Sequence, residues 1–125
     1  MEKEFGTYEQ ALALKDLGFD EPCMAIYYSK DKSFSWHHHK DHTNNEPVLD
    51  SGEFNISAPL YQQAFRWFRE KYNLQAEMVF SEKPDRFYYY IGNMVTGDME
   101  RGTDMSYEEA EQACLDKLIE MIKNK

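Results

Sequence analysis

Apolar side chains recur at helical spacing in the segment that follows Pro59. They fall at positions i, i+3, i+4, i+7 and i+11, the pattern of one continuous apolar face on a helix. The members of this stripe are Tyr61, Ala64, Phe65, Phe68 and Tyr72. Asn73 follows, a residue type that commonly ends helices in a left-handed conformation. The pattern therefore predicts a helix over residues 59–72.

Two further helices are predicted from their start signals. Thr7 with Gln10, and Ser106 with Glu109, match the capping box. In this motif the hydroxyl accepts from the backbone N–H three residues on, and the longer side chain bonds back to the cap. Gly18 stands where a left-handed residue ends the first helix. Apolar positions after both boxes, continuing to residue 122 in the second, complete the two predicted helices.

Four runs have the composition or the alternation of β-strands, and they pair into two predicted hairpins. The first joins residues 23–28 to 34–39 through a polar loop longer than the two-residue type. The second joins residues 74–80 to 87–91. Its apolar positions, which we expect to face the helix at 59–72, are Met78, Phe80, Phe87, Tyr89 and Ile91. The stretch 94–105 is compatible with a loop or with a short extra strand.

The order of elements is αββ-αββ-α, which favours an α+β fold. We expect one domain over residues 1–125, in two layers, with an antiparallel sheet of about four strands packed by three helices. Residues 40–57 are rich in turn-forming residues and predict a flexible or variable loop. A chain of 125 residues has the usual length of a single domain.

The composition argues against a membrane-spanning, secreted or disulfide-stabilised protein. No apolar run approaches the ~20 residues that span a bilayer, and the polar start of the chain does not match a secretory signal. Cys23 and Cys114 are too few for a disulfide framework and fit no zinc motif. We therefore expect a cytoplasmic protein, with both thiols reduced and buried.

The chain is acidic, with 23 acidic against 14 basic residues and a formal net charge of -9. Double-stranded nucleic acid and anionic membranes both attract basic surfaces, so neither is an expected partner. The predicted order at the end of the chain is similar to part of a double-stranded RNA-binding domain. However, the last helix carries Glu108, Glu109 and Glu111 in its first turns, where a phosphate-binding helix would be basic.

All four histidines lie within six residues: His37, His38, His39 and His42. On a strand His37 and His39 would project from one face, a spacing used by paired imidazole ligands of zinc. His42 or Asp41 could supply a third ligand. The competing interpretation is a solvated strand end that binds nothing specific. We expect no resident cofactor, and a divalent metal at this cluster is the alternative hypothesis.

Three other groups of residues suggest chemistry. Tyr88–Tyr90 alternate across a strand, so at least one ring could stack unpaired bases, although the preference of strands for aromatic residues favours sheet packing. Arg66 and Arg69 share a helix face and could hold a carboxylate, a phosphate or an acidic partner, or form an ordinary solvated face. Cys114 lies on an apolar helix face, which favours inert packing over nucleophilic catalysis. No P-loop or nucleophile elbow is present.

Three segments of the chain resemble a family of small uncharacterised proteins encoded by bacteriophages, prophages and other bacterial mobile elements. They are YEQALALKDLGFDEPC at 8–23, APLYQQAFRWFREKY at 58–72 and YEEAEQACLDKLIE at 107–120. The resemblance covers the three predicted helices and does not include residues 30–56. It implies a phage or mobile-element origin but transfers no activity and no site residue.

These observations favour a non-enzymatic accessory protein that acts by protein–protein contact through an acidic surface, with a host or phage protein as partner. An acidic protein can compete with nucleic acid for a basic cleft on its partner. The first alternative is a metal-binding module or small metal-dependent enzyme built on His37, His39 and His42. The second is single-stranded nucleic-acid binding through Tyr88–Tyr90. The sequence leaves the oligomeric state open.

Overall fold

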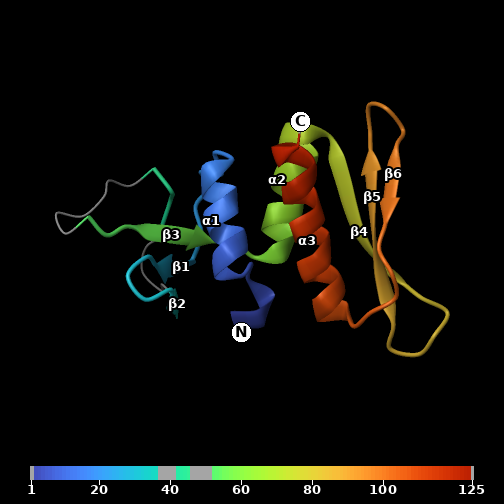
Figure 1. Ribbon diagram of the computed structural model, residues 1–125, viewed down its shortest axis with the longest axis horizontal. Coiled ribbons are helices and arrows are strands. Elements are labelled where there is room, and N and C mark those ends of the chain that lie inside the picture. Colours follow the sequence, from blue (N-terminus) through green and yellow to red (C-terminus); the bar gives the residue numbers. More distant parts are fainter. Residues whose placement is uncertain (1, 37–41, 46–51, 125) are drawn as a thin grey trace. The chain divides into compact units, whose positions relative to one another are not determined.

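The computed structural model describes residues 2–36, 42–45 and 52–124 (Figure 1). Its elements in chain order are a short 3₁₀ helix η1 (Glu2–Glu4), α1 (Tyr8–Asp16), β1 (Ala25–Tyr28), β2 (Phe34–Trp36), β3 (Asn55–Ala58), α2 (Tyr61–Tyr72), β4 (Leu74–Phe80), β5 (Phe87–Asn93), β6 (Met99–Arg101) and α3 (Tyr107–Lys123). The class is α+β, as the sequence predicts. Six strands form two antiparallel sheets of three, in place of the expected sheet of about four.

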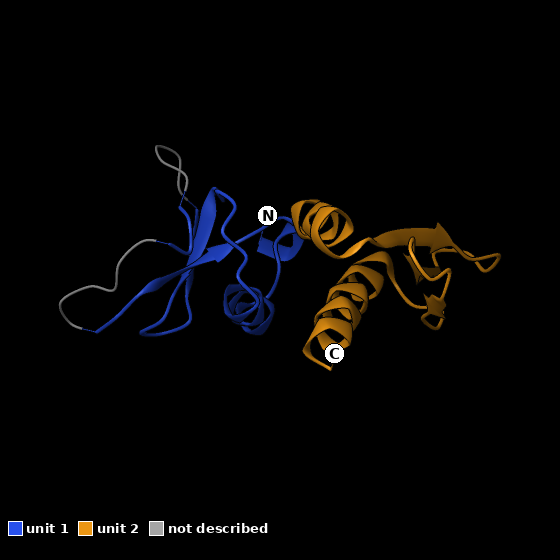
Figure 2. Cartoon of the chain, turned by 90° about the horizontal axis from the view of Figure 1, so that it is seen from above, with its two compact units in different colours: residues 1–60 blue, residues 61–125 orange. Residues whose placement is uncertain are grey.

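The chain divides into two compact units, residues 1–60 and residues 61–125, which Figure 2 colours separately. Each unit combines helix with one three-stranded sheet. Unit 1 holds α1 and the sheet β2-β1-β3, and unit 2 holds α2, α3 and the sheet β4-β5-β6.

In unit 1 the core lies between α1 and the central strand β1. Ala11 of α1 packs with Ala25 and Tyr27 of β1 and with Ile56 of β3, all nearly or fully buried. The Tyr27 hydroxyl donates to the Gly6 carbonyl at 2.8 Å, and burial raises the pKa of this phenol to about 12. A buried hydrogen bond thus ties the segment before α1 to the sheet.

Strand β3 corrects the prediction of a loop over residues 40–57. It starts at Asn55 and pairs antiparallel with β1, with Ile56 opposite Tyr27 and Ala58 opposite Ala25. The sequence Asn-Ile-Ser-Ala alternates polar and apolar residues over only four positions, a run too short to predict a strand without its pairing to β1. The rest of the predicted loop lies partly outside the described residues, at 40–41 and 46–51.

In unit 2 both helices cover the same face of the sheet, and no helix among the described residues of this unit lies on the other face (Figure 1). The predicted second hairpin is confirmed, with β4 and β5 paired from Leu74–Asn93 to Phe80–Phe87. Ile91 is buried on the helix side, where Ala76 and Met78 join it. Phe80 has the same orientation, but it ends the strand and is 64% exposed, so the expectation that it packs against α2 is wrong.

Three of the end signals read from the sequence are confirmed. The Thr7 and Ser106 hydroxyls accept from the N–H groups of Gln10 and Glu109, whose side chains bond back to the cap backbone. Asn73 ends α2 with a positive φ of 59°. In the α3 box, the hydrogen bonds from Ser106 lower the pKa of Glu109. The cap is therefore strongest when this carboxylate is ionised.

The stretch after β5 forms the short third strand of unit 2. Met99 pairs with Gly92 and Arg101 with Tyr90. Gly102 lies under an aromatic ring: a Cβ at this position would overlap the Tyr89 side chain. This close approach explains why a residue without a side chain follows β6.

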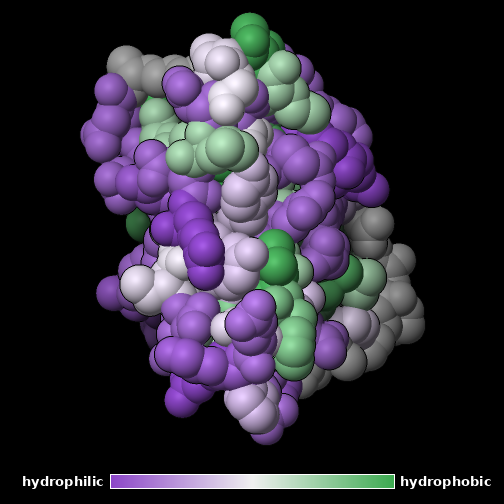
Figure 3. Space-filling view, turned by 90° about the vertical axis from the view of Figure 1, so that its right-hand side faces the viewer, coloured by the Kyte–Doolittle hydropathy of each residue, from purple (hydrophilic) through white to green (hydrophobic). Residues whose placement is uncertain are grey.

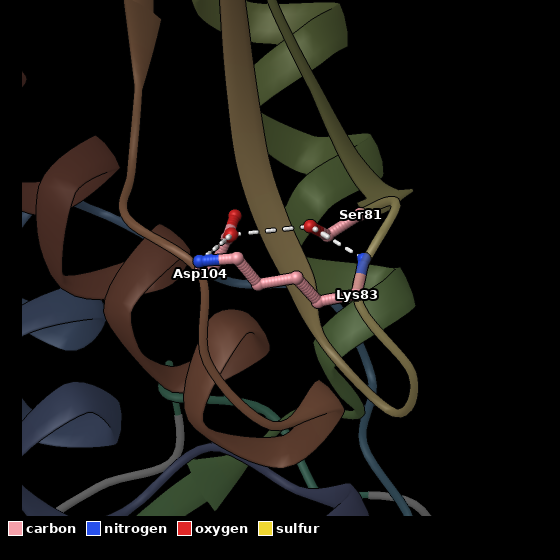
Figure 4. Close-up of polar contacts among 3 residues, drawn as sticks. All are labelled: Ser81, Lys83 and Asp104. Carbon is pink, nitrogen blue, oxygen red and sulfur yellow. Dashed lines mark hydrogen bonds and ion pairs between the residues drawn. The ribbon is translucent and has the colours of Figure 1, made fainter.

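One polar cluster joins the β4–β5 turn to the connection between β6 and α3 (Figure 4). The buried Ser81 hydroxyl donates to Asp104 Oδ2 at 3.1 Å and accepts from the Lys83 N–H at 3.4 Å. The Lys83 ammonium lies 3.9 Å from the same carboxylate oxygen. These contacts hold the β4–β5 turn against the segment that leads into α3.

Candidate functional site

The open face of unit 2 is the face of the sheet β4-β5-β6 that the helices leave uncovered. Because side chains alternate along a strand, Tyr88 and Tyr90 point away from the face that buries Ile91. The register then places cross-strand partners beside the two tyrosines. On β4 these are Gln75, Glu77 and Val79, and on β6 they are Met99 and Arg101.

The side chains of this open face contact one another. The Arg101 guanidinium lies 3.9 Å from the centre of the Tyr88 ring, a cation–π geometry. The Tyr90 hydroxyl contacts the Met99 sulfur. These contacts order the two tyrosine rings, and the helices of unit 2 leave the rings uncovered.

Several apolar side chains of unit 2 are strongly exposed, three of them on β6 or in the turn that precedes it. Met99 is 66% exposed, and Met94 and Val95, in the turn between β5 and β6, are 54% and 75% exposed. Figure 3 views this side of the molecule and shows hydrophobic patches, in green, within a mostly hydrophilic surface. Met99 lies on the open face and Met94 and Val95 lie in the turn beside it, and exposed apolar side chains grouped in this way are typical of a binding surface.

Arg66 and Arg69 lie on the exposed side of α2, as the sequence predicts. The Arg66 Nε is 3.8 Å from Glu70 Oε1, and both side chains are more than half exposed. Both arginines line a hollow of about 100 Å³ beside β4, and a neighbouring hollow of about 300 Å³ continues past Phe65 and Met78. The two candidates therefore border a groove and do not lie on a featureless helix surface.

His42 is the one candidate metal ligand within the described residues, and it is buried in unit 1. Its backbone pairs with Cys23, and its Nδ1 lies 2.7 Å from the Ser57 hydroxyl. Ser57 Oγ donates to the His42 carbonyl at 3.1 Å, so Nδ1 acts as the donor to Ser57. A metal at His42 would therefore have to use Nε2.

The remaining members of the histidine hypothesis, His37 and His39, lie outside the described residues, as does Asp41. Among the described residues no group of three His, Cys, Asp or Glu side chains is placed to hold a metal ion. The hypothesis of a site at His37, His39 and His42 therefore stays a prediction.

Both cysteines are buried free thiols, Cys23 at 2% exposure and Cys114 at 0%. Burial, with a smaller contribution from nearby Glu111, raises the pKa of Cys114 to about 12. Because the thiolate is the nucleophile, a thiol held neutral at physiological pH is poorly reactive. This environment agrees with the packing role predicted for Cys114.

Comparison with known proteins gave no match to any family model, curated protein or solved structure. Within the described residues, no helix is long and apolar enough to cross a membrane.

The sequence indicated part of the open face and missed the rest. The Tyr88–Tyr90 run is visible from its composition. Met99 and Arg101 fall in a three-residue strand with no apolar alternation, and their position beside the tyrosines depends on pairing between β5 and β6. The sequence contained one usable signal, an apolar Met-Val pair at 94–95 before a glycine turn, which is unusual for an exposed loop.

Proposed function

We propose that this protein is a non-enzymatic protein–protein interaction module and that a partner protein docks on the open face of unit 2. The observation that carries this proposal is the exposure of Met99 beside Tyr90 on the open face, with Met94 and Val95 exposed in the adjoining β5–β6 turn. Burying such side chains against a partner removes apolar surface from water, which is the main driving force for association.

The chemistry of the face supports a protein as the partner. Tyrosine, methionine and arginine are enriched in protein interfaces, and Tyr and Arg dominate among residues whose truncation weakens binding. Tyr88 and Arg101 already contact each other. Both groups are thus partly ordered before binding, which reduces the entropy lost on association.

The charge of unit 2 also favours a protein over a polyanion. Residues 61–125 carry 12 acidic and nine basic residues. The exposed acidic side chains of α3 include Glu108, Asp116 and Glu120. The net negative charge of unit 2 would steer a basic partner toward it. Together with the resemblance to phage and mobile-element proteins, this supports a host or phage protein as the partner, in the cytoplasm of a bacterial or phage-infected cell.

A second candidate function is single-stranded nucleic-acid binding on the same face. The observation that favours it is the stacked pair of Tyr88 and Arg101 on an open sheet, because aromatic rings and guanidinium groups both stack on bases. The negative charge of unit 2 opposes it. Partner capture with and without nuclease separates the two functions.

The proposed function is tested by quantitative capture from a lysate of the source cells. Met99→Glu places a charge on the open face at β6, and Gln112→Glu adds the same charge at an exposed position of α3. We expect a protein that wild type and Gln112→Glu retain equally, that survives nuclease treatment, and that Met99→Glu retains at least about tenfold less. Equal retention by Met99→Glu contradicts the proposal, and loss on nuclease treatment supports the second candidate.

A further inference from the structure

The outer edge of β4 is a second candidate binding surface, and it is formed by residues different from those of the open face. β4 is an edge strand of seven residues, and within the described part of the chain no strand pairs with its outer side. Such edges present unpaired N–H and C=O groups and can accept an added strand.

The backbone hydrogen bonds show which residues of β4 face outward. Ser81 donates its N–H to the Arg86 carbonyl, and Met94 donates its N–H to the Asn73 carbonyl. Residues 73 and 81 therefore direct their backbones toward the β5 side. Because this orientation alternates along a strand, Ala76 and Met78 direct their N–H and C=O groups away from β5.

The outward-facing residues line the groove described above. The hollow of about 300 Å³ is lined by Ala76, Glu77 and Met78 of β4, by Gln62 and Phe65 of α2 and by Tyr107 of α3. The neighbouring hollow of about 100 Å³ adds Arg66 and Arg69 to the α2 wall. An unpaired strand edge thus runs beside a helix that supplies one apolar and two cationic side chains.

We propose that this groove binds an extended acidic peptide segment of a partner protein, which adds to β4 as a fourth strand. Its backbone would bond to Ala76 and Met78, and its carboxylates would meet Arg66 and Arg69. Guanidinium groups pair well with carboxylates and can do so in bidentate geometry. The Arg66–Glu70 contact joins two exposed side chains and offers little resistance to exchange of partners.

The two sides of the added strand would meet different charges. Glu77 projects to the open face, on the side opposite that of Ala76 and Met78. Acidic side chains at alternate positions would therefore all face α2 and its arginines. Adjacent acidic residues would place one carboxylate toward Glu77, so the groove favours the pattern acid-x-acid.

Fluorescence anisotropy with the full chain tests this inference. The probe is a labelled Thr-Val-Glu-Val-Glu-Val-Thr peptide, and the control, Thr-Val-Val-Glu-Glu-Val-Thr, has the same composition and charge. We expect the probe to bind, the control to bind roughly tenfold more weakly, and binding to weaken with salt. The absence of probe binding at about 1 mM, or equal binding of both peptides, overturns the inference.

Substitutions of residues that line or border the groove show where the peptide probe binds. Arg66→Gln with Arg69→Gln is expected to weaken probe binding at least about tenfold, and each single variant to weaken it in part, whereas Arg86→Gln, which removes one positive charge in the β4–β5 turn, leaves it unchanged. Glu70→Gln removes the competing carboxylate and should tighten binding. Unchanged affinity of the double variant overturns the inference.

Two further experiments test whether the peptide binds by adding a strand to β4. Ala76→Pro removes an outward N–H and leaves the β4–β5 ladder intact, a position at which an edge strand tolerates proline. We expect this variant to lose probe binding while keeping its far-ultraviolet circular dichroism. Amide exchange of the wild type gives an independent measurement, because Ala76 and Met78 amides should gain protection with the probe. No gain in their protection overturns the mode.

Discussion

Phe68→Ala is expected to lower the free energy of unfolding by about 3–5 kcal/mol, since this is the usual effect of truncating a buried phenylalanine. Phe68 is fully buried in unit 2, and its ring lies 5.1 Å from that of Trp67 and 5.8 Å from that of Tyr72. Removing the ring loses apolar burial and leaves a cavity among these neighbours. Domains of this size have total stabilities of only ~5–15 kcal/mol, so unit 2 should melt at much lower urea.

Arg66→Ala is the matched control, two residues away on the same helix. Its side chain is 53% exposed and its contact with Glu70 is a surface ion pair. We expect a change within about 0.5 kcal/mol. Urea melts followed by tryptophan fluorescence measure both variants, and a larger loss for Arg66→Ala than for Phe68→Ala would contradict the assignment of the buried face.

Ile56→Ala is the second variant with a large expected effect, a loss of about 2–5 kcal/mol. Ile56 is fully buried, stands opposite Tyr27 in the sheet and belongs to the core of unit 1. The prediction is informative because the sequence pattern assigned this position to a flexible loop, where the same change would have almost no effect.

Ile56→Val provides the graded control. It removes one methylene group and keeps the branched shape that suits a strand, so we expect about 0.5–1.5 kcal/mol. Urea melts of the two variants and the wild type give the order of their free energies of unfolding. Equal stabilities of all three proteins would mean that β3 does not contribute to the core.

The parts of the fold that the sequence predicts correctly depend on local interactions. The capping boxes at Thr7 and Ser106 join residues three apart, and the Asn73 cap concerns a single φ angle. The hairpin of β4 and β5 closes through a short turn, so its alternation alone sets the register.

The missed parts depend on pairing between distant or weakly patterned segments. β3 is held by β1, almost 30 residues earlier in the chain, and β6 has only three exposed residues. The groove beside β4 requires the packing of α2 on the sheet, which no local pattern encodes. Arg66 and Arg69 could be named as candidates from their shared face, but their relation to the outward N–H groups of Ala76 and Met78 required the structure.

Site-specific photo-cross-linking in the source cells tests the central claim most directly. A benzoylphenylalanine placed at Tyr90 lies on the open face, and one placed at Gln112 lies on exposed α3. The account predicts a discrete protein adduct from position 90 that position 112 does not form and that Met99→Glu suppresses. The absence of a protein adduct from position 90, or the same adducts from both positions, would contradict a partner docked on the open face.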